Sequence, residues 1–150
     1  MQSEALVRVA RQACKIELSS TSLSAEQVTA LVSALSENQQ IQDIDLSDKS
    51  LAHVDPELLA SLMSRTRRVN LVNTSLTALQ VTELLRTLTS STCRIESLDL
   101  SFNQLSMMEP ELLAEAVNKL KDATLLGTGL SVNQVLRIHH TYLLMKIISI

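Results

Sequence analysis

The stretch that decides the fold is LDLSFNQLSMMEPELLAEAVNKL, residues 98–120. A close copy, IDLSDKSLAHVDPELLASLMSR, occupies residues 44–65. Both stretches begin with alternating apolar residues, as in a half-buried β-strand, and continue with apolar residues spaced as on one face of a helix. A duplicated strand–helix unit of this kind is typical of a structural repeat rather than of a catalytic site.

The unit recurs five times on the frame LxxLxLxx(N/T)xL. The five frames cover residues 13–23, 41–51, 66–76, 95–105 and 120–130, with starts about 25 to 29 residues apart. The copies also alternate, because TSLSAEQVTALVSAL and TSLTALQVTELLRTL resemble each other and a DPELL or EPELL copy follows each of them. The duplicated block is therefore a pair of repeats, about 54 residues long.

Helix starts are predicted at one fixed point of every frame. Ser24, Thr77 and Ser131 each precede a glutamine by three residues, which is the pattern of a capping box. Asp55 and Glu109 each precede a proline, which is favoured at the first helical position. Aspartate is a good N-cap residue and glutamate a weaker one. Each repeat is thus a short strand followed by a helix.

A strand–helix unit this small cannot bury its own apolar face, so neighbouring units must stack into a solenoid. The sequence predicts an α/β solenoid over residues 13–136, with a parallel sheet on the concave face and helices on the convex face. Residues 1–12 are expected to form a helix, either a cap or the outer helix of a preceding half-repeat. The apolar residues 137–150 are a helical cap, the cut edge of a longer array, or a self-association surface.

These motifs resemble those of leucine-rich repeat proteins, specifically the long-repeat type with full helices seen in ribonuclease inhibitor. Similar repeats occur in the sensor and regulatory regions of NOD-like innate immune receptors. The LxLSxN signature is clear in LDLSFNQL, whereas Thr21, Thr74 and Thr128 replace its asparagine in three other repeats. Lys49 departs further because an ammonium accepts no hydrogen bond, so the second turn must be closed in another way.

Composition argues against several classes of function. The formal net charge is −3, and the chain contains one Phe, one Tyr and no Trp, so neither a basic nucleic-acid binder nor a base-stacking platform is expected. The start of the chain lacks a signal-peptide pattern and no apolar run suggests a membrane span, so we expect a cytoplasmic protein without a membrane partner. The cysteines lack metal-site spacing and the two glycines form no phosphate loop, so no cofactor is expected.

Candidate catalytic or metal-binding residues have weak support. Asp45 and Asp99 belong to strands two spacings apart, about 9–10 Å, and no cleft is implied between them. His139 and His140 are adjacent, so they would not face the same way on a helix. The RTRR cluster at residues 65–68 is too short to indicate nucleic-acid binding and is expected to be solvated. We therefore expect no enzymatic activity.

The residues between the frame leucines should point from the concave face of the sheet. One predicted row contains Glu17, Asp45, Asn70, Asp99 and Thr124. Six carboxylates stand on this face against Lys15 and Arg68, so it is acidic overall. The predicted protein-binding residues are Glu17, Asp43, Asp45, Asp48, Asn70, Val72, Asp99, Phe102 and Leu126.

The sequence thus predicts a non-catalytic module that binds a protein with a basic patch, with Phe102 or Leu126 as an apolar anchor. The alternative for this face is a solvated surface whose acids only maintain solubility. The resemblance implies a setting in innate-immune sensing or regulation. Two other functions stay open: self-association into a homo-oligomer through residues 137–150, and regulation of an enzyme such as a nuclease or GTPase.

Overall fold

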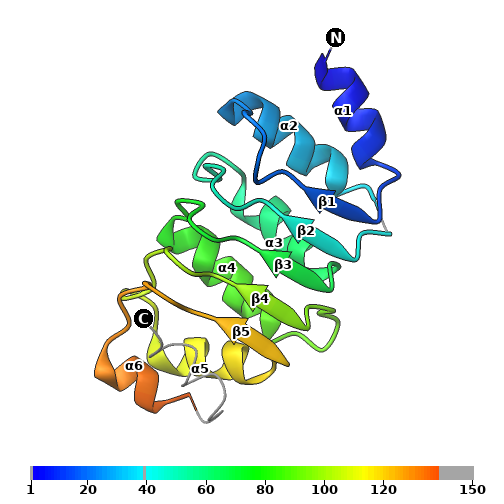
Figure 1. Ribbon diagram of the computed structural model, residues 1–150. Coiled ribbons are helices and arrows are strands. Elements are labelled where there is room, and N and C mark those ends of the chain that lie inside the picture. Colours follow the sequence, from blue (N-terminus) through cyan, green and yellow to red (C-terminus); the bar gives the residue numbers. More distant parts are fainter. Residues whose placement is uncertain (1, 39, 139–150) are drawn as a thin grey trace.

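The computed structural model describes residues 2–38 and 40–138 (Figure 1). Five short strands alternate with helices along this part of the chain. The helices are α1 (Gln2–Ala10), α2 (Ala25–Leu35), α3 (Pro56–Ser64), α4 (Ala78–Leu88), α5 (Pro110–Asn118) and α6 (Val132–Leu136). The strands are β1 (Lys15–Glu17), β2 (Asp43–Asp45), β3 (Arg68–Asn70), β4 (Ser97–Asp99) and β5 (Asp122–Thr124).

The five strands form one parallel sheet in the order β1-β2-β3-β4-β5. Their register places the same frame position of every repeat side by side, because each middle residue faces the middle residue of the next strand. These middle residues are all buried: Ile16, Ile44, Val69, Leu98 and Ala123. The predicted α/β architecture with a parallel sheet is therefore confirmed, and the frame alignment is correct at every strand.

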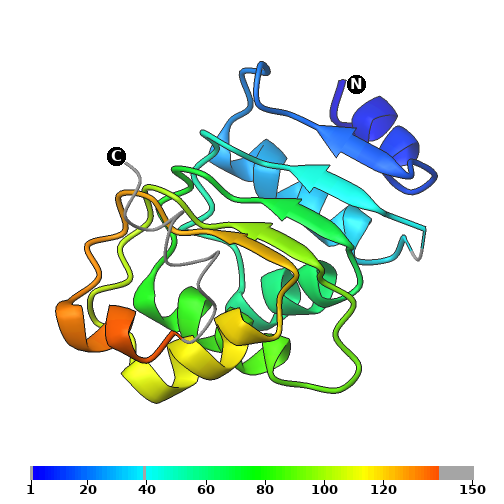
Figure 2. The same ribbon diagram turned by 60° about the horizontal axis from the view of Figure 1, so that its bottom comes forward.

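Helices α2 to α5 cover one side of the sheet (Figure 2). The aliphatic core lies between these two layers and is built mainly from the frame leucines and the apolar stripes of the helices. The opposite side of the sheet is formed by the first and third residues of each strand, and we call it the open face. These residues are exposed or half-buried in all five strands.

The predicted helix starts are confirmed at each repeat. Ser24, Thr77 and Ser131 form complete capping boxes, in which the hydroxyl accepts from the N3 amide and the glutamine side chain accepts from the cap N–H. The Asp55 side chain accepts a hydrogen bond from the Leu58 N–H at 2.9 Å. Glu109 makes no such bond, as expected for a weaker cap residue.

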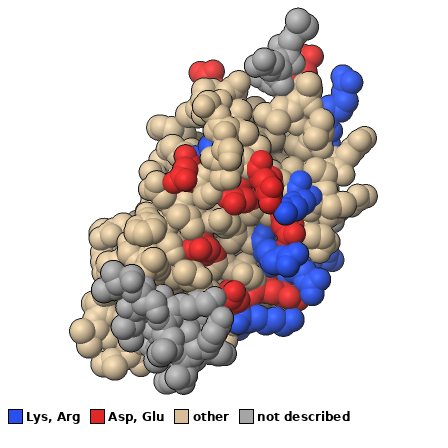
Figure 3. All heavy atoms as spheres, in the orientation of Figure 1, with Lys and Arg blue, Asp and Glu red and all other residues tan. Residues whose placement is uncertain are grey.

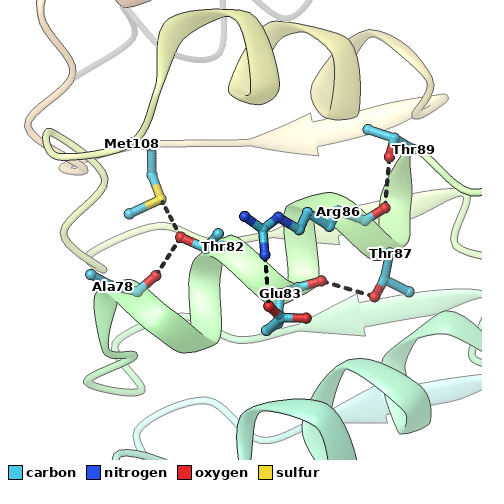
Figure 4. Close-up of polar contacts among 7 residues, drawn as sticks. All are labelled: Ala78, Thr82, Glu83, Arg86, Thr87, Thr89 and Met108. Atoms are coloured by element: carbon cyan, nitrogen blue, oxygen red, sulfur yellow. Dashed lines mark hydrogen bonds and ion pairs between the residues drawn. The ribbon is translucent and has the colours of Figure 1, made fainter.

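Thr82, Glu83, Arg86 and Thr87 of α4 make hydrogen bonds or ion pairs within this helix (Figure 4). The Thr82 hydroxyl donates to the Ala78 carbonyl at 2.8 Å and lies 3.7 Å from the sulfur of Met108, which precedes α5. Arg86 pairs with Glu83 at 3.1 Å on the exposed surface. Met108 itself is buried, so the loop of the fourth repeat packs against the helix of the third.

The turns after the strands are closed in two ways. Where the frame residue is threonine, its hydroxyl donates to the carbonyl three residues earlier, as from Thr74 to Leu71 at 2.8 Å. Asn103 instead reaches the preceding repeat, because its amide donates to the Leu71 carbonyl at 2.6 Å and its oxygen accepts from the Leu76 N–H at 3.2 Å. Threonine repeats are thus closed locally, and Asn103 joins two repeats.

Lys49 occupies the asparagine position of the second repeat and also reaches backward. Its buried side chain donates from Nζ to the Ser19 carbonyl of the first repeat at 3.3 Å. The second turn is therefore closed by a donor alone, which is the different closure that the sequence required. Lys49 has no acceptor in place of the Asn103 oxygen, so among the described residues its side chain makes fewer hydrogen bonds to the preceding repeat than that of Asn103.

The capping-box glutamines make a second set of contacts between repeats. The amide of Gln80 donates to the carbonyls of Leu51 and Val54 at 2.6 and 2.7 Å. Gln134 donates in the same way to the carbonyls of Leu105 and Met108 at 2.9 and 2.8 Å. Both glutamine side chains are buried. Each therefore caps its own helix and binds the loop of the preceding DPELL-type repeat.

The first repeat is covered by α1, which packs against α2. The Asn38 amide fixes the end of this helix by donating to the carbonyls of Ala10 and Ala13 at 2.7 and 2.8 Å. At the other end Arg137 pairs with Glu111 at 2.7 Å, and the rest of the predicted C-terminal segment, with His139 and His140, lies outside the described residues. Within residues 2–38 and 40–138, no helix is both long and apolar enough to cross a membrane.

Candidate protein-binding face

Five of the predicted binding residues line one shallow hollow of about 370 Å³ on the open face. The register places Glu17, Asp45, Asn70 and Asp99 in a single row across β1 to β4, as the sequence predicts. Asp43 belongs to the neighbouring row, at the start of β2. Because the hollow is wide and shallow, it suits a surface of another macromolecule better than an enclosed small ligand.

Ion pairs occupy the side of the hollow where the strands begin. Arg68 forms a two-point contact with Asp43, from Nε at 2.5 Å and from Nη2 at 3.0 Å. The hydrogen bond from Arg68 lowers the pKa of the Asp43 carboxyl below its ordinary value. Lys15 pairs with Glu17 at 2.7 Å, and this contact raises the pKa of the lysine. Two of the six predicted carboxylates are therefore neutralised within the face itself.

The carboxylates at the strand ends have a structural task as well. One Asp45 oxygen accepts from the N–H and the hydroxyl of Ser47 at 2.9 and 2.6 Å. Asp99 accepts from the Ser101 N–H at 2.9 Å in the equivalent turn. Among the described residues neither carboxylate has a cationic partner. These two charges therefore hold the turns and still give this side of the hollow its negative character.

The other four predicted residues lie outside the hollow, in the loops that follow the strands. Val72 and Leu126 are half-buried, whereas Asp48 is exposed and accepts from the Asn73 amide at 2.9 Å. Phe102 is 57% exposed, although it is the only phenylalanine of the chain. Its N–H donates to the Leu126 carbonyl at 2.8 Å, so Phe102 and Leu126 come from adjacent turns.

The backbone of Phe102 is unusual because its φ is +60°. The equivalent residues of the second, third and fifth repeats, Asp48, Asn73 and Gly127, have φ values of +59°, +54° and +64°. Asp, Asn and Gly tolerate this left-handed region, whereas a bulky residue there is strained. Among these four residues, Phe102 is therefore the one whose side chain is disfavoured in the left-handed conformation.

Gly127 makes room for the Phe102 ring. A Cβ atom on Gly127 would lie 2.6 Å from Cδ1 and 2.7 Å from Cε1 of this ring, which is closer than real contacts allow. The ring thus lies against the backbone of the fifth repeat, with its other side exposed to solvent. Sequence reasoning missed the strain at this site, although alignment of the four equivalent residues contains its signal.

The hollow and the loops beside it offer groups for noncovalent binding of another molecule. Within the part of the chain that the structure describes, no group of three or more His, Cys, Asp or Glu side chains is arranged to hold a metal ion. The available elements are two hydrogen-bonded carboxylates that have no cationic partner among the described residues, two internal ion pairs, and one exposed aromatic ring beside half-buried aliphatic side chains. Such a combination can bind a surface through charge and one apolar anchor.

No protein-family model and no curated protein matches the chain. Among solved structures, the chain is similar to one described as the C-terminal domain of tropomodulin, from structural genomics of Caenorhabditis elegans. The TM-score is 0.67 at 16% sequence identity, and the match covers 97% of this chain and 93% of that chain. At this identity the likeness concerns the fold alone. It supports a leucine-rich-repeat-like α/β fold and identifies no subfamily.

Proposed function

We propose that this chain is a non-catalytic module that binds a partner protein on the open face and the loop that follows β4, with Phe102 of this loop as the apolar anchor. The observation that carries the proposal is the exposed ring of Phe102 on a left-handed backbone. An aromatic side chain in this conformation costs stability, and such local strain clusters at functional sites. Aromatic anchors also contribute a large share of the binding energy in protein interfaces.

The charges of the face indicate the kind of partner. Asp45 and Asp99 lack cationic partners among the described residues, so a partner with basic side chains near an apolar pocket would fit both features of the face. Such charges mainly raise the association rate and select the partner, whereas the buried anchor slows dissociation. The setting in innate-immune regulation and the regulation of an enzyme rest on the sequence resemblance and remain predictions.

The proposal is tested by quantitative affinity capture from cell extract with three forms of the chain. The wild type is compared with Phe102→Asn, which removes the ring and suits the left-handed backbone, so that the fold is retained. The matched control is Leu79→Asn, because Leu79 is an equally exposed apolar residue at 60% and lies on α4. Circular dichroism first verifies that both variants are folded.

We expect specific partners to be lost with Phe102→Asn and kept with Leu79→Asn. A partner that uses the carboxylates should also bind more slowly to Asp99→Asn, which keeps an acceptor oxygen for the Ser101 N–H and removes the charge. Capture that is unchanged by all these variants would exclude the open face as the binding site. If the captured protein is a second copy of this chain, the function is self-association, and the mass in solution would show it.

A further inference from the structure

A second hollow lies beside the edge of the sheet where the strands begin. It has a volume of about 340 Å³ and is formed by the loops that follow α3 and α4. The residues lining this hollow, which we call the arginine pocket, are Gln42, Arg65, Arg67, Cys93, Arg94, Ile95 and Glu96. Three arginines against one glutamate make it positive, although the whole chain has a net charge of −3. Figure 3 shows blue side chains gathered along the right-hand edge of the molecule, with red ones among them.

Part of this positive charge has a structural explanation. The edge lies at the C-terminal ends of the helices, where cations interact favourably with unpaired carbonyls. Arg65 accordingly donates to the carbonyls of Ser36 and Ser61. Lys119 donates to the Thr89 carbonyl at 2.5 Å. Arg65 is therefore half-buried and fixed, which corrects the expectation that the whole RTRR cluster is solvated.

Arg67 and Arg94 are not explained in this way. Arg67 donates from Nε to Glu96 at 3.2 Å, and the same glutamate also pairs with Lys121 at 3.2 Å. These two hydrogen bonds lower the pKa of Glu96, so it stays ionised and is already shared between two cations. Within the described residues the Arg94 guanidinium has no hydrogen-bonding or ionic partner. The pocket thus keeps more guanidinium donors than its own acceptors can use.

The loops that carry these arginines are tied to each other. The Arg94 N–H donates to the Ser64 carbonyl at 2.7 Å, and the Glu96 N–H donates to the Arg67 carbonyl at 2.8 Å. The two loops therefore cannot move apart without breaking backbone hydrogen bonds. The backbone that carries the arginines is thus fixed, whereas the side chain of the exposed Arg94 is still to be ordered when an anion binds.

We propose that the arginine pocket binds a phosphate group. The guanidinium fork matches phosphate oxygens in a two-point geometry, and a dianion has enough acceptors for several arginines at once. A single carboxylate matches the pocket less well, because Glu96 already supplies one. The phosphate comes either as free inorganic phosphate or on a phosphorylated peptide side chain, and the pocket recognises the same chemistry in both. This site is separate from the open face and does not depend on the function proposed there.

Cys93 provides a reporter inside the pocket. Its thiol is half-buried, and burial raises its pKa. The other thiol, Cys14, is exposed and is removed by Cys14→Ser. The rate at which the neutral reagent N-ethylmaleimide modifies Cys93 is then measured at a fixed alkaline pH. A bound phosphate should slow the reaction, because it covers the thiol and its negative charge disfavours the thiolate.

The measurement uses inorganic phosphate, a phosphoserine peptide and the same peptide without phosphate, each against chloride of equal ionic strength. We expect saturable protection of Cys93 by phosphate, and Arg94→Gln should weaken it about tenfold through loss of charged hydrogen bonds. Arg8→Gln is the matched control, because Arg8 is exposed on α1 and does not line the pocket. In Arg8→Gln, phosphate should protect Cys93 at the same concentration as in the wild type.

The two sources of phosphate are distinguished by their concentrations for half protection. Tighter protection by the phosphopeptide identifies a peptide site, and equal or tighter protection by inorganic phosphate identifies a site for the free anion. Protection that is absent, that chloride reproduces, or that Arg94→Gln leaves unchanged would overturn the proposal. An unchanged circular dichroism spectrum and urea midpoint of Arg94→Gln verify that the variant has kept its fold.

Discussion

The strain at Phe102 can be measured by comparing two substitutions. Phe102→Ala and Phe102→Asn both remove the ring and its contact with Gly127, so both lose a similar part of the buried apolar area. They differ in the backbone, because alanine is disfavoured at a φ of +60° by about 1–2 kcal/mol, whereas asparagine tolerates it. We therefore expect Phe102→Asn to be about 1 kcal/mol more stable than Phe102→Ala.

Urea denaturation followed by circular dichroism gives the difference in the free energy of unfolding. The same comparison at Leu79 is the control, because this residue lies in the first turn of α4, where alanine has the higher helix propensity. The order should therefore reverse, with Leu79→Ala more stable than Leu79→Asn. Equal stability of the two Phe102 variants, or the same order at both positions, would refute the argument that the backbone at Phe102 is strained.

Three further predictions follow from contacts within and between repeats. Lys49→Asn should stabilise the fold by about 1 kcal/mol in urea denaturation, because asparagine supplies the acceptor that the buried lysine lacks. Gln80→Ala should lower the free energy of unfolding by about 2–3 kcal/mol. Gln27→Ala should lower it by about 1 kcal/mol, because among the described residues the Gln27 amide is not bound to a preceding loop. Equal losses would contradict the role of Gln80 between repeats. Because Arg68 lowers the pKa of Asp43, their contact stabilises the fold above the ordinary carboxyl value of 3.8 and is lost as the pH falls through the lowered value. Arg68→Gln should therefore reduce stability at neutral pH and have no such effect in strong acid, and a penalty that persists in acid would contradict this assignment.

The repeat frame and the helix starts could be predicted because their signals are local. A capping box lies within four consecutive residues, and strand alternation lies within three to five. The ionic contact between Arg68 and Asp43 could not be predicted in the same way, since it joins two strands and depends on which side chains share a row and reach each other. The predicted acidic character of the face therefore holds at Asp45 and Asp99. On the side where the strands begin, Asp43 and Glu17 are instead neutralised by Arg68 and Lys15.

The arginine pocket shows the same limit. The RTRR cluster was visible in the sequence, but Arg94 and Glu96 join it only when the loop after α4 is placed beside the loop after α3. The left-handed backbone at Phe102, in contrast, could have been predicted from the sequence, because the aligned repeats contain the evidence for it. Asp48, Asn73 and Gly127 are residue types that favour positive φ, and Phe102 stands in the same column.

The contacts between repeats also explain why the duplicated block is a pair. Gln80 and Gln134 bind carbonyls of a preceding DPELL-type repeat, whereas Asn103 binds the turn of a preceding threonine repeat. Each junction thus joins a threonine repeat to a DPELL-type repeat. Copying a single repeat would place two repeats of the same type side by side, and these contacts would be lost. The pairing has a consequence for the open face as well, because Asp45 and Asp99 recur in alternate strands. A partner would therefore meet carboxylates separated by two strand spacings, about 9–10 Å, and basic side chains at that spacing would match the pattern that the duplication produced.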